Sequence, residues 1–376
     1  MNTLITVLAS LWVTTAHAQE PPIQISGYVS TVIDGRFRPN ATPEFQRELG
    51  FRGSRAGITF TGTPLEDWSF KSYFYLGGET LTVLTNAGLV DSDNDGSVDS
   101  LAKDTASAVT NFVREATLSW HASDSTSLKM GRMRIPLTSQ AQSPDTALMF
   151  PDRAGPNAVF LEGTDLGGLF SFDGNNSKVA GSLGLFNGTG QGVGRSTQLG
   201  VLYTGRVDIN PLGAFTLDES GPGIGPYRWG FGAGFVYHPY TSYDSGGYSA
   251  VSVHDFRGSA SLRFAGRGLH FLAEGLFRYE MDSLKNRPNW ASGAFSQISW
   301  FLPSGIEPSA RMGWAAEDQS FAPRHTLWID GGLNMYPGYE HEPADIVKVS
   351  AHYLGEYRLT ERDIAHGLSV QMQITW

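Results

Sequence analysis

The carboxyl-terminal stretch of the chain alternates strictly between apolar and polar side chains. Its apolar positions are Leu368, Val370, Met372, Ile374 and Trp376, and its polar positions are Ser369, Gln371, Gln373 and Thr375. Successive side chains of a β-strand point to opposite faces, so this stretch predicts a strand with one apolar and one polar face. A terminal aromatic residue is typical of the closing strand of an outer-membrane barrel, although a single such strand also suits a soluble sandwich.

The same alternation recurs along the whole chain, in about sixteen segments of about ten residues each. These are Ile23–Ser30, Ser54–Gly62, Trp68–Leu76, Phe112–Trp120, Ser127–Ile135, Asp165–Phe172, Lys178–Phe186, Gln198–Ile209, Arg228–Tyr237, Val253–Ala265, Leu269–Glu280, Gly293–Phe301, Ser309–Trp314, Thr326–Tyr336, Val347–Leu354 and His366–Trp376. Short turns, such as 210–213 and 265–268, alternate with longer loops, of which 77–110 and 136–163 stand out. We expect loop 77–110 to be extracellular.

A closed barrel is the fold that this pattern favours. Within a bilayer every backbone N–H and C=O needs an internal partner, and an open sheet leaves its edges unpaired. The sequence therefore predicts an all-β protein, a transmembrane antiparallel β-barrel of about 16 strands. A barrel of about that size is wide enough to hold an aqueous channel.

The amino terminus and the composition agree with an exported barrel. Residues 1–18 predict a signal peptide, because an apolar core is followed by Ala16-His17-Ala18, which matches an A-x-A cleavage site. The basic residues that usually precede such a core are missing. Residues 19–376 then form one barrel, which lipid surrounds. The chain has no cysteine, so no disulfide supports the fold, and its net charge of −10 argues against a nucleic-acid partner.

Charged residues on the polar faces locate the interior of the barrel. A charge facing lipid near the bilayer midplane costs roughly 2–4 kcal/mol, so we expect these residues to face the lumen. The basic residues predicted to line the pore and bind anions are Arg55, Lys71, Lys129, Arg132, Arg134, Arg206, Arg257, Arg263, Arg278, Arg311 and Lys348. The acidic residues predicted to face inward are Glu115, Asp208, Asp255, Glu274, Glu280 and Asp330. Basic residues lead, which favours anions in a pore, but pairing across the wall would leave that preference weak.

The segment Ser127–Ile135 contains a conflict of parity. Arg132 and Arg134 share one face, so they are expected inward with Met133 and Ile135 outward, whereas Lys129 lies on the other face. A bulge near Gly131 would shift the register by one residue and turn all three charges inward. The alternative is that one of these charges sits at the membrane interface.

Two blocks of sequence resemble the phosphate-selective porin O and P family. The first runs from Gly131 through Pro136-Leu137 and continues with Phe150 and Asp152-Arg153; the second is 331–337, leading to 347–349 and 352–353. The resemblance implies a sixteen-stranded homotrimeric porin whose third long loop, here 136–163, folds into the lumen as a constriction. It further implies that Arg153 lies at the narrowest point and that lumen arginines and lysines bind phosphate-like anions.

Residues 91–99 match the first nine positions of a calcium-binding loop. Asp91, Asp93, Asp95 and Asp99 supply hard oxygen ligands, and Gly96 stands at the sharp turn. The twelfth position is Ala102, where a bidentate carboxylate belongs. The segment is therefore either an extracellular Ca²⁺ site or a solvated acidic loop, and no other cofactor is indicated.

No enzymatic motif is present. His341-Glu342 is followed by Pro343, so no H-E-x-x-H zinc motif forms, and no G-x-S-x-G sequence occurs. We therefore predict a non-enzymatic porin in the outer membrane of a Gram-negative bacterium, through which small anionic, phosphate-like solutes diffuse passively. The alternative is a non-conducting surface barrel that acts as a calcium-stabilised adhesin or scaffold.

Overall fold

The computed structural model describes residues 23–39, 47–76, 113–160, 163–174, 176–188, 200–215, 218–221, 225–243, 250–282, 287–317, 323–338 and 346–376. The predicted signal peptide, loop 77–110 and the acidic segment Asp91–Asp99 lie outside these ranges. No helix within them is long and apolar enough to cross a membrane.

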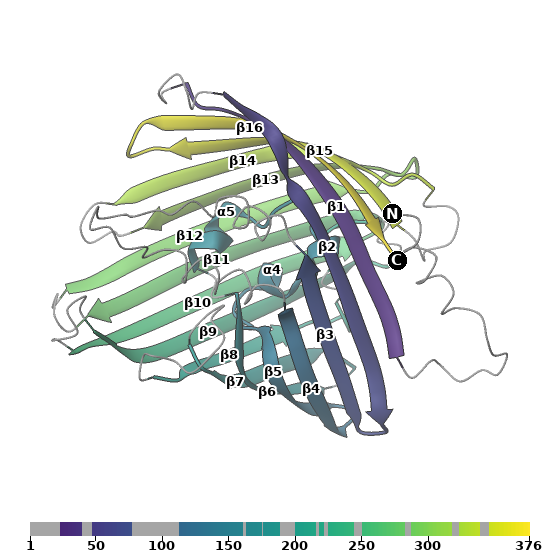
Figure 1. Ribbon diagram of the computed structural model, residues 1–376, viewed down its shortest axis with the longest axis vertical. Helices are drawn as coiled ribbons and strands as arrows, with labels where there is room; N and C mark the ends of the chain where they lie inside the picture. Colours follow the sequence, from purple (N-terminus) through teal and green to yellow (C-terminus); the bar gives the residue numbers. More distant parts are fainter. Residues whose placement is uncertain are drawn as a thin grey trace, which may run out of the picture.

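Sixteen antiparallel strands close into a barrel, in which each strand pairs with its sequence neighbours and the first with the last (Figure 1). The strands are β1 Ile23–Phe37, β2 Arg47–Leu65, β3 Trp68–Leu76, β4 Val113–Ser123, β5 Thr126–Arg134, β6 Thr164–Gly174, β7 Val179–Phe186, β8 Leu202–Ile209, β9 Arg228–Tyr243, β10 Ala250–Gly266, β11 Leu269–Asp282, β12 Arg287–Trp300, β13 Ile306–Glu317, β14 Arg324–Met335, β15 Ile346–Arg358 and β16 Asp363–Thr375. The predicted fold class is confirmed. The ladder between β1 and β16, with Tyr28 opposite Thr375, leaves no sheet edge unpaired.

The two faces of the wall differ as the alternation predicts. In β16, Leu368 and Met372 are 58% and 51% exposed, whereas Ser369 and Gln371 are 0% and 6% exposed. The apolar side chains thus form the outer surface, which suits hydrocarbon, and the polar ones face the interior.

The chain between β5 and β6 folds into the barrel, as predicted. It contains the short helices α4 (Ser139–Gln142), η3 (Asp145–Ala147) and α5 (Gly155–Phe160), and Figure 1 shows α4 and α5 enclosed by the strands. We call residues 135–163 the inner loop. Its presence makes much of the interior a packed protein core.

The predicted orientation of Met133 and Ile135 is wrong. Both are buried, 4% and 3% exposed, in an apolar cluster inside the barrel. The other members are Leu137, Leu169, Phe186, Leu202 and Val236. These side chains point inward because the inner loop offers them an apolar surface there, and burying one of them fully contributes about 1.5–3 kcal/mol.

The predicted bulge at Gly131 is also wrong. The pairing of β5 with β4 and with β6 runs through Gly131 without a register shift. Gly131 instead has φ +124°, a conformation that side chains disfavour. Lys129 faces inward opposite Ser119, while Arg132 pairs with Ala116 on the opposite parity.

The turn predicted at 210–213 exists, but it only begins a longer connection. The Gly213 amide donates to the Asn210 carbonyl at 2.9 Å, and β9 starts only at Arg228. Within this connection, residues 218–221 lie against the inner loop, since the Glu219 amide donates to the Ala147 carbonyl at 3.0 Å. The connection therefore supplies a second segment inside the barrel, at the end where the chain terminates.

Candidate functional site: the inner loop and the ion pairs at its free edge

The inner loop is fixed first to the wall formed by β8 to β12. Helix α4 begins at Thr138, whose hydroxyl accepts from the Ala141 amide at 3.0 Å. The buried carboxylate of Glu274 accepts from the Ser139 amide at 2.6 Å, so an acid stands at the positive end of this short helix. Arg206 donates to the Leu137 carbonyl at 3.0 Å.

Helix α5 continues this attachment through apolar packing. Phe160 is fully buried against Leu276, Ala291 and Ala315 of β11, β12 and β13. Arg257 of β10 donates to the Phe160 carbonyl at 3.0 Å. The carboxyl end of the loop is therefore held by both polar and apolar contacts.

The middle of the loop is fixed to β13–β16 through its backbone carbonyls. Arg311 donates to the carbonyl of residue 152 at 2.8 Å, and Asn334 to that of residue 149 at 3.0 Å. Lys348 donates to the carbonyl of residue 148 at 2.5 Å, and Gln373 to that of residue 146 at 3.0 Å. These four wall side chains close the space between the loop and this side of the barrel.

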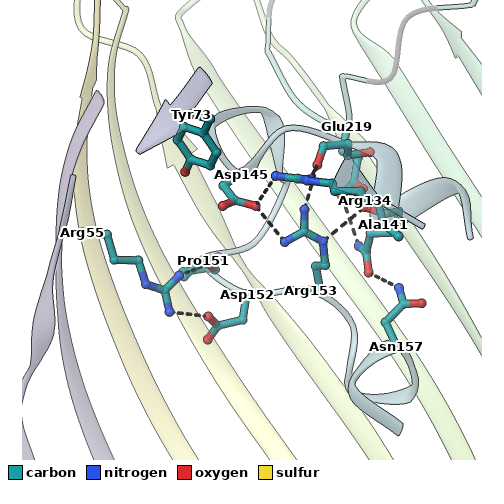
Figure 2. A network of polar contacts seen from close by, with 12 residues as sticks. Arg55, Tyr73, Arg134, Ala141, Asp145, Pro151, Asp152, Arg153, Asn157 and Glu219 are labelled. Atoms are coloured by element: carbon teal, nitrogen blue, oxygen red, sulfur yellow. Dashed lines mark hydrogen bonds and ion pairs between the residues drawn. The ribbon is translucent and has the colours of Figure 1, made fainter. Parts of the chain in front are cut away.

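The remaining edge of the loop faces β1–β5 and carries a group of ion pairs (Figure 2). The Asp145 carboxylate accepts from Arg153 at 2.8 Å and from Arg134 of β5 at 3.3 Å. Asp152 accepts from Arg55 of β2 at 2.9 Å, which links the loop directly to the opposite wall. Glu115 of β4 completes the group.

Glu115 joins the two basic residues of the neighbouring strands. It accepts from Lys71 of β3 at 2.7 Å and from Arg134 at 2.9 Å. The hydroxyls of Tyr28 and Tyr73 lie 3.2 Å apart beside this group. We call the seven ionised residues Arg55, Lys71, Glu115, Arg134, Asp145, Asp152 and Arg153 the eyelet group. It contains four cations and three anions.

Asp145 is the anion that the two loop-side arginines share. Burial alone would raise its pKa, but the guanidinium groups of Arg153 and Arg134 outweigh burial and lower the pKa from 3.8 to about 2. Asp145 is therefore ionised at neutral pH, and it cancels part of the positive charge at the edge of the loop.

Two polar spaces lie on either side of the eyelet group. One, of about 170 Å³, opens toward the end away from the carboxyl terminus and is lined by Asp34, Asp152 and Arg153. The other, of about 390 Å³, lies on the terminal side and is lined by Lys71, Lys129 and Asp145 among others. A third space of about 580 Å³ adjoins the second, because Thr146 and Thr375 line both. The eyelet group thus lies between the space on the terminal side and the space toward the other end of the barrel.

Other predicted pore residues are engaged in the wall. Arg206 and Arg263 share Asp208, Arg257 and Arg278 share Asp255, and Arg311 pairs with Asp330, all at 2.6–2.9 Å. These residues face inward, but their charge is largely balanced by their partners. The net positive charge that the lumen presents to solute is therefore much smaller than the sequence suggests.

Lys129 and Arg132 differ from the paired residues and from each other. Lys129 lines the space of about 390 Å³ and makes no hydrogen bond or ion pair within the part of the chain that the structure describes. Arg132 is 9% exposed, and its Nε donates to the Thr164 hydroxyl at 3.4 Å. Of the two, Lys129 is the side chain that presents its charge to the lumen.

Sequence reasoning missed the acidic residues of the irregular segments. Asp145 and Asp152 of the inner loop, Glu219 of the β8–β9 connection and Glu307 of β13 all lie inside the barrel. The first three are on segments without periodicity, which gives no signal for the direction of a side chain. Glu307 lies two residues before Ser309, on the inward face of β13, so the period-2 pattern could have placed it in the lumen. It was missed because the predicted strand began only at Ser309.

The candidate calcium ligands Asp91, Asp93, Asp95 and Asp99 fall outside the described ranges, so that site stays a prediction. Among the residues that are described, no cluster of three or more His, Cys, Asp or Glu could hold a metal ion. His270 and His352, which face the lumen, have structural partners: His270 donates to the Gly221 carbonyl at 3.3 Å, and His352 lies 3.0 Å from Asn334.

Comparison with solved structures places the fold among outer-membrane barrels. OmpT of Vibrio cholerae in a trimer form has a TM-score of 0.54 at 10% identity over 95% of this chain and all of that one. An anion-selective porin from Comamonas acidovorans has 0.54 at 12% identity, over 94% and 99% of the chains. The outer-membrane channel DcaP of Acinetobacter baumannii has 0.55 at 9% identity, over 94% and 97%.

At these identities the likeness establishes the fold, which is that of outer-membrane β-barrels. No family model and no curated protein matches the sequence. The resemblance to the phosphate-selective porin O and P family therefore stays a prediction.

Proposed function

We propose that this chain is a porin of the Gram-negative outer membrane, through which small solutes diffuse passively down their own gradient. The observation that carries the proposal is the pair of polar spaces on either side of the eyelet group, inside a closed barrel whose outer surface is apolar. The inner loop sets the size of the solute, because it fills the rest of the lumen.

We further propose a modest preference for small anions, including phosphate-like ones. The eyelet group holds one more cation than anions, and Lys129 adds an unpaired charge to the adjoining space. Fixed positive charge lowers the electrostatic barrier for an anion. The pairing of the other lumen arginines keeps the preference small. A homotrimer is the assembly we expect, as in the trimer form of the Vibrio cholerae neighbour.

Planar-bilayer recording with a KCl gradient tests this function. We expect stable conductance and a reversal potential displaced slightly toward the chloride equilibrium value. A potential displaced toward potassium would refute the anion preference but keep the channel. The absence of conductance from a correctly folded barrel would refute the porin and favour the surface scaffold.

A further inference from the structure

The interior segment 218–221, which we call the connector segment, lies between the inner loop and the wall at the terminal end of the barrel. Its neighbours in the space of about 580 Å³ include Thr146 and Ala147 of the loop and Lys348 of β15. It belongs to a connection between strands at the end where turns are short in barrels of this kind. Its position inside the barrel therefore indicates that the segment has a structural function.

Glu219 fastens the connector segment to the loop and to the wall at once. Its carboxylate accepts from Gln140 of α4 at 3.2 Å and from Gln297 of β12 at 2.7 Å. Gln140 also accepts, through its own Oε1, from the Ala154 amide at 2.8 Å. Glu219, Gln140 and Gln297 are 6%, 0% and 1% exposed, so each lost hydrogen bond would leave a buried donor unpaired.

Ser220 and Gly221, next to Glu219, add further hydrogen bonds to the loop and to the wall. The Ser220 hydroxyl donates to the Leu148 carbonyl at 3.2 Å and accepts from Lys348 at 3.0 Å. The Gly221 amide donates to Glu307 at 3.3 Å. The segment thus bonds on one side to loop residues 140–148 and on the other to β12, β13 and β15.

The connector segment also stands between a small pocket and the open space at the terminal end. The pocket, of about 20 Å³, is lined by Glu219, Leu272 and Gln297, and four residues line both it and the space of about 580 Å³. Those four are Phe215, Asp218, Ala265 and His270. Removing the segment would join the pocket to the lumen.

We propose that Glu219 and Ser220 are positioning residues for the channel: they fasten the inner loop from the terminal side and seal the lumen along β11–β13. Solute is thereby confined to the spaces on either side of the eyelet group. This inference rests on the proposed diffusion function, but the sealing of the wall can be tested without ion flow.

The experiment uses the absence of cysteine from the chain. Leu272→Cys introduces one thiol at this small pocket, where Leu272 is 6% exposed, and its labelling by a charged methanethiosulfonate reagent is followed in the folded barrel. In the Glu219→Ala/Ser220→Ala background we expect labelling on the order of tenfold faster, the factor that corresponds to about 1.4 kcal/mol of lost anchoring. Asp124→Ala is the matched control, because its side chain is exposed in the turn between β4 and β5, away from the segment but at the same end of the barrel; we expect no change in labelling.

Single-channel conductance of the same variants gives the second readout. We expect the double variant to conduct more than the parent and to admit larger solutes, while heat-modifiable gel mobility shows that the barrel is closed. Unchanged labelling in a closed double-variant barrel would overturn the proposal. If the double variant does not fold, Glu219→Gln and Ser220→Ala are tested singly against the same criterion. A parent without conductance would refute the diffusion function, and the labelling comparison would still decide the role of the segment.

Discussion

Removing the Asp145 carboxylate tests whether the eyelet group controls both selectivity and the position of the inner loop. Asp145→Asn keeps the shape of the side chain but leaves Arg153 and Arg134 without the anion that they share at 2.8 and 3.3 Å. The excess of the eyelet group then rises from one positive charge to two. A unit charge at about 4 Å in water contributes about 1 kcal/mol, with opposite sign for an anion and for a cation. The two effects together amount to about 2 kcal/mol, so we expect the ratio of anion to cation permeability to rise about thirtyfold.

The same substitution should lower the free energy of unfolding. A shift of the Asp145 pKa from 3.8 to about 2 corresponds to about 2 kcal/mol that favours the folded state. Because the folded pKa is the lower one, this contribution is complete above pH 3.8 and is lost as the pH falls through about 2. The parent should therefore lose this contribution on acidification below pH 3.8, whereas the variant has already lost it at neutral pH.

Reversal potentials at pH 7 and urea unfolding of barrels in lipid vesicles measure the two effects. Asp67→Asn is the control, because Asp67 lies in the exposed turn between β2 and β3 and the substitution removes a charge outside the lumen. The reasoning fails if Asp145→Asn leaves both the reversal potential and the urea midpoint at the values of the parent.

Three further substitutions probe other parts of the site. Lys129→Ala removes the unpaired lumen cation and should lower anion permeability relative to cation permeability by a few-fold, as measured by reversal potential; a rise would show that its charge does not face solute. Arg55→Ala breaks the link from β2 to residues 151 and 152 and should increase open-channel current noise, while unchanged noise would contradict a fastening role. Gly131→Ala places a Cβ about 2.1 Å from the Ala116 carbonyl oxygen at φ +124°, so the yield of folded, heat-modifiable barrel should fall, and a normal yield would contradict the backbone geometry.

The strands could be predicted from the sequence because their signal is local. A period of two follows from the backbone of a strand, and a polar lumen against an apolar membrane makes that period visible in residues such as Ser369 and Leu368. Closure of the barrel could be predicted because an open sheet within a bilayer would leave the backbone groups of its edge strands without hydrogen-bond partners. The number of strands was therefore within reach, whereas the inward fold of 136–163 was expected only from the family resemblance.

The eyelet group could not be predicted in full, because three of its seven residues come from a segment without a period. Arg55, Lys71 and Arg134 lie on strands and were found, and Arg153 entered only through a family resemblance. Asp145 and Asp152 were missed, since the direction of a loop side chain depends on where the loop packs. The sequence therefore suggested an excess of positive charge that these loop carboxylates partly cancel.

The error at Met133 and Ile135 has a physical cause that bears on function. Apolar side chains were assigned to lipid because a water-filled lumen offers them nothing. The barrel, however, contains a second apolar environment, formed where the inner loop packs against β5–β9. An inward apolar residue on a strand of such a barrel therefore indicates where the lumen is filled by protein, and an inward unpaired charge such as Lys129 indicates where it is filled by water. By this criterion the water-filled space on the terminal side of the eyelet group lies against β1–β5, where Lys71 and Lys129 face it.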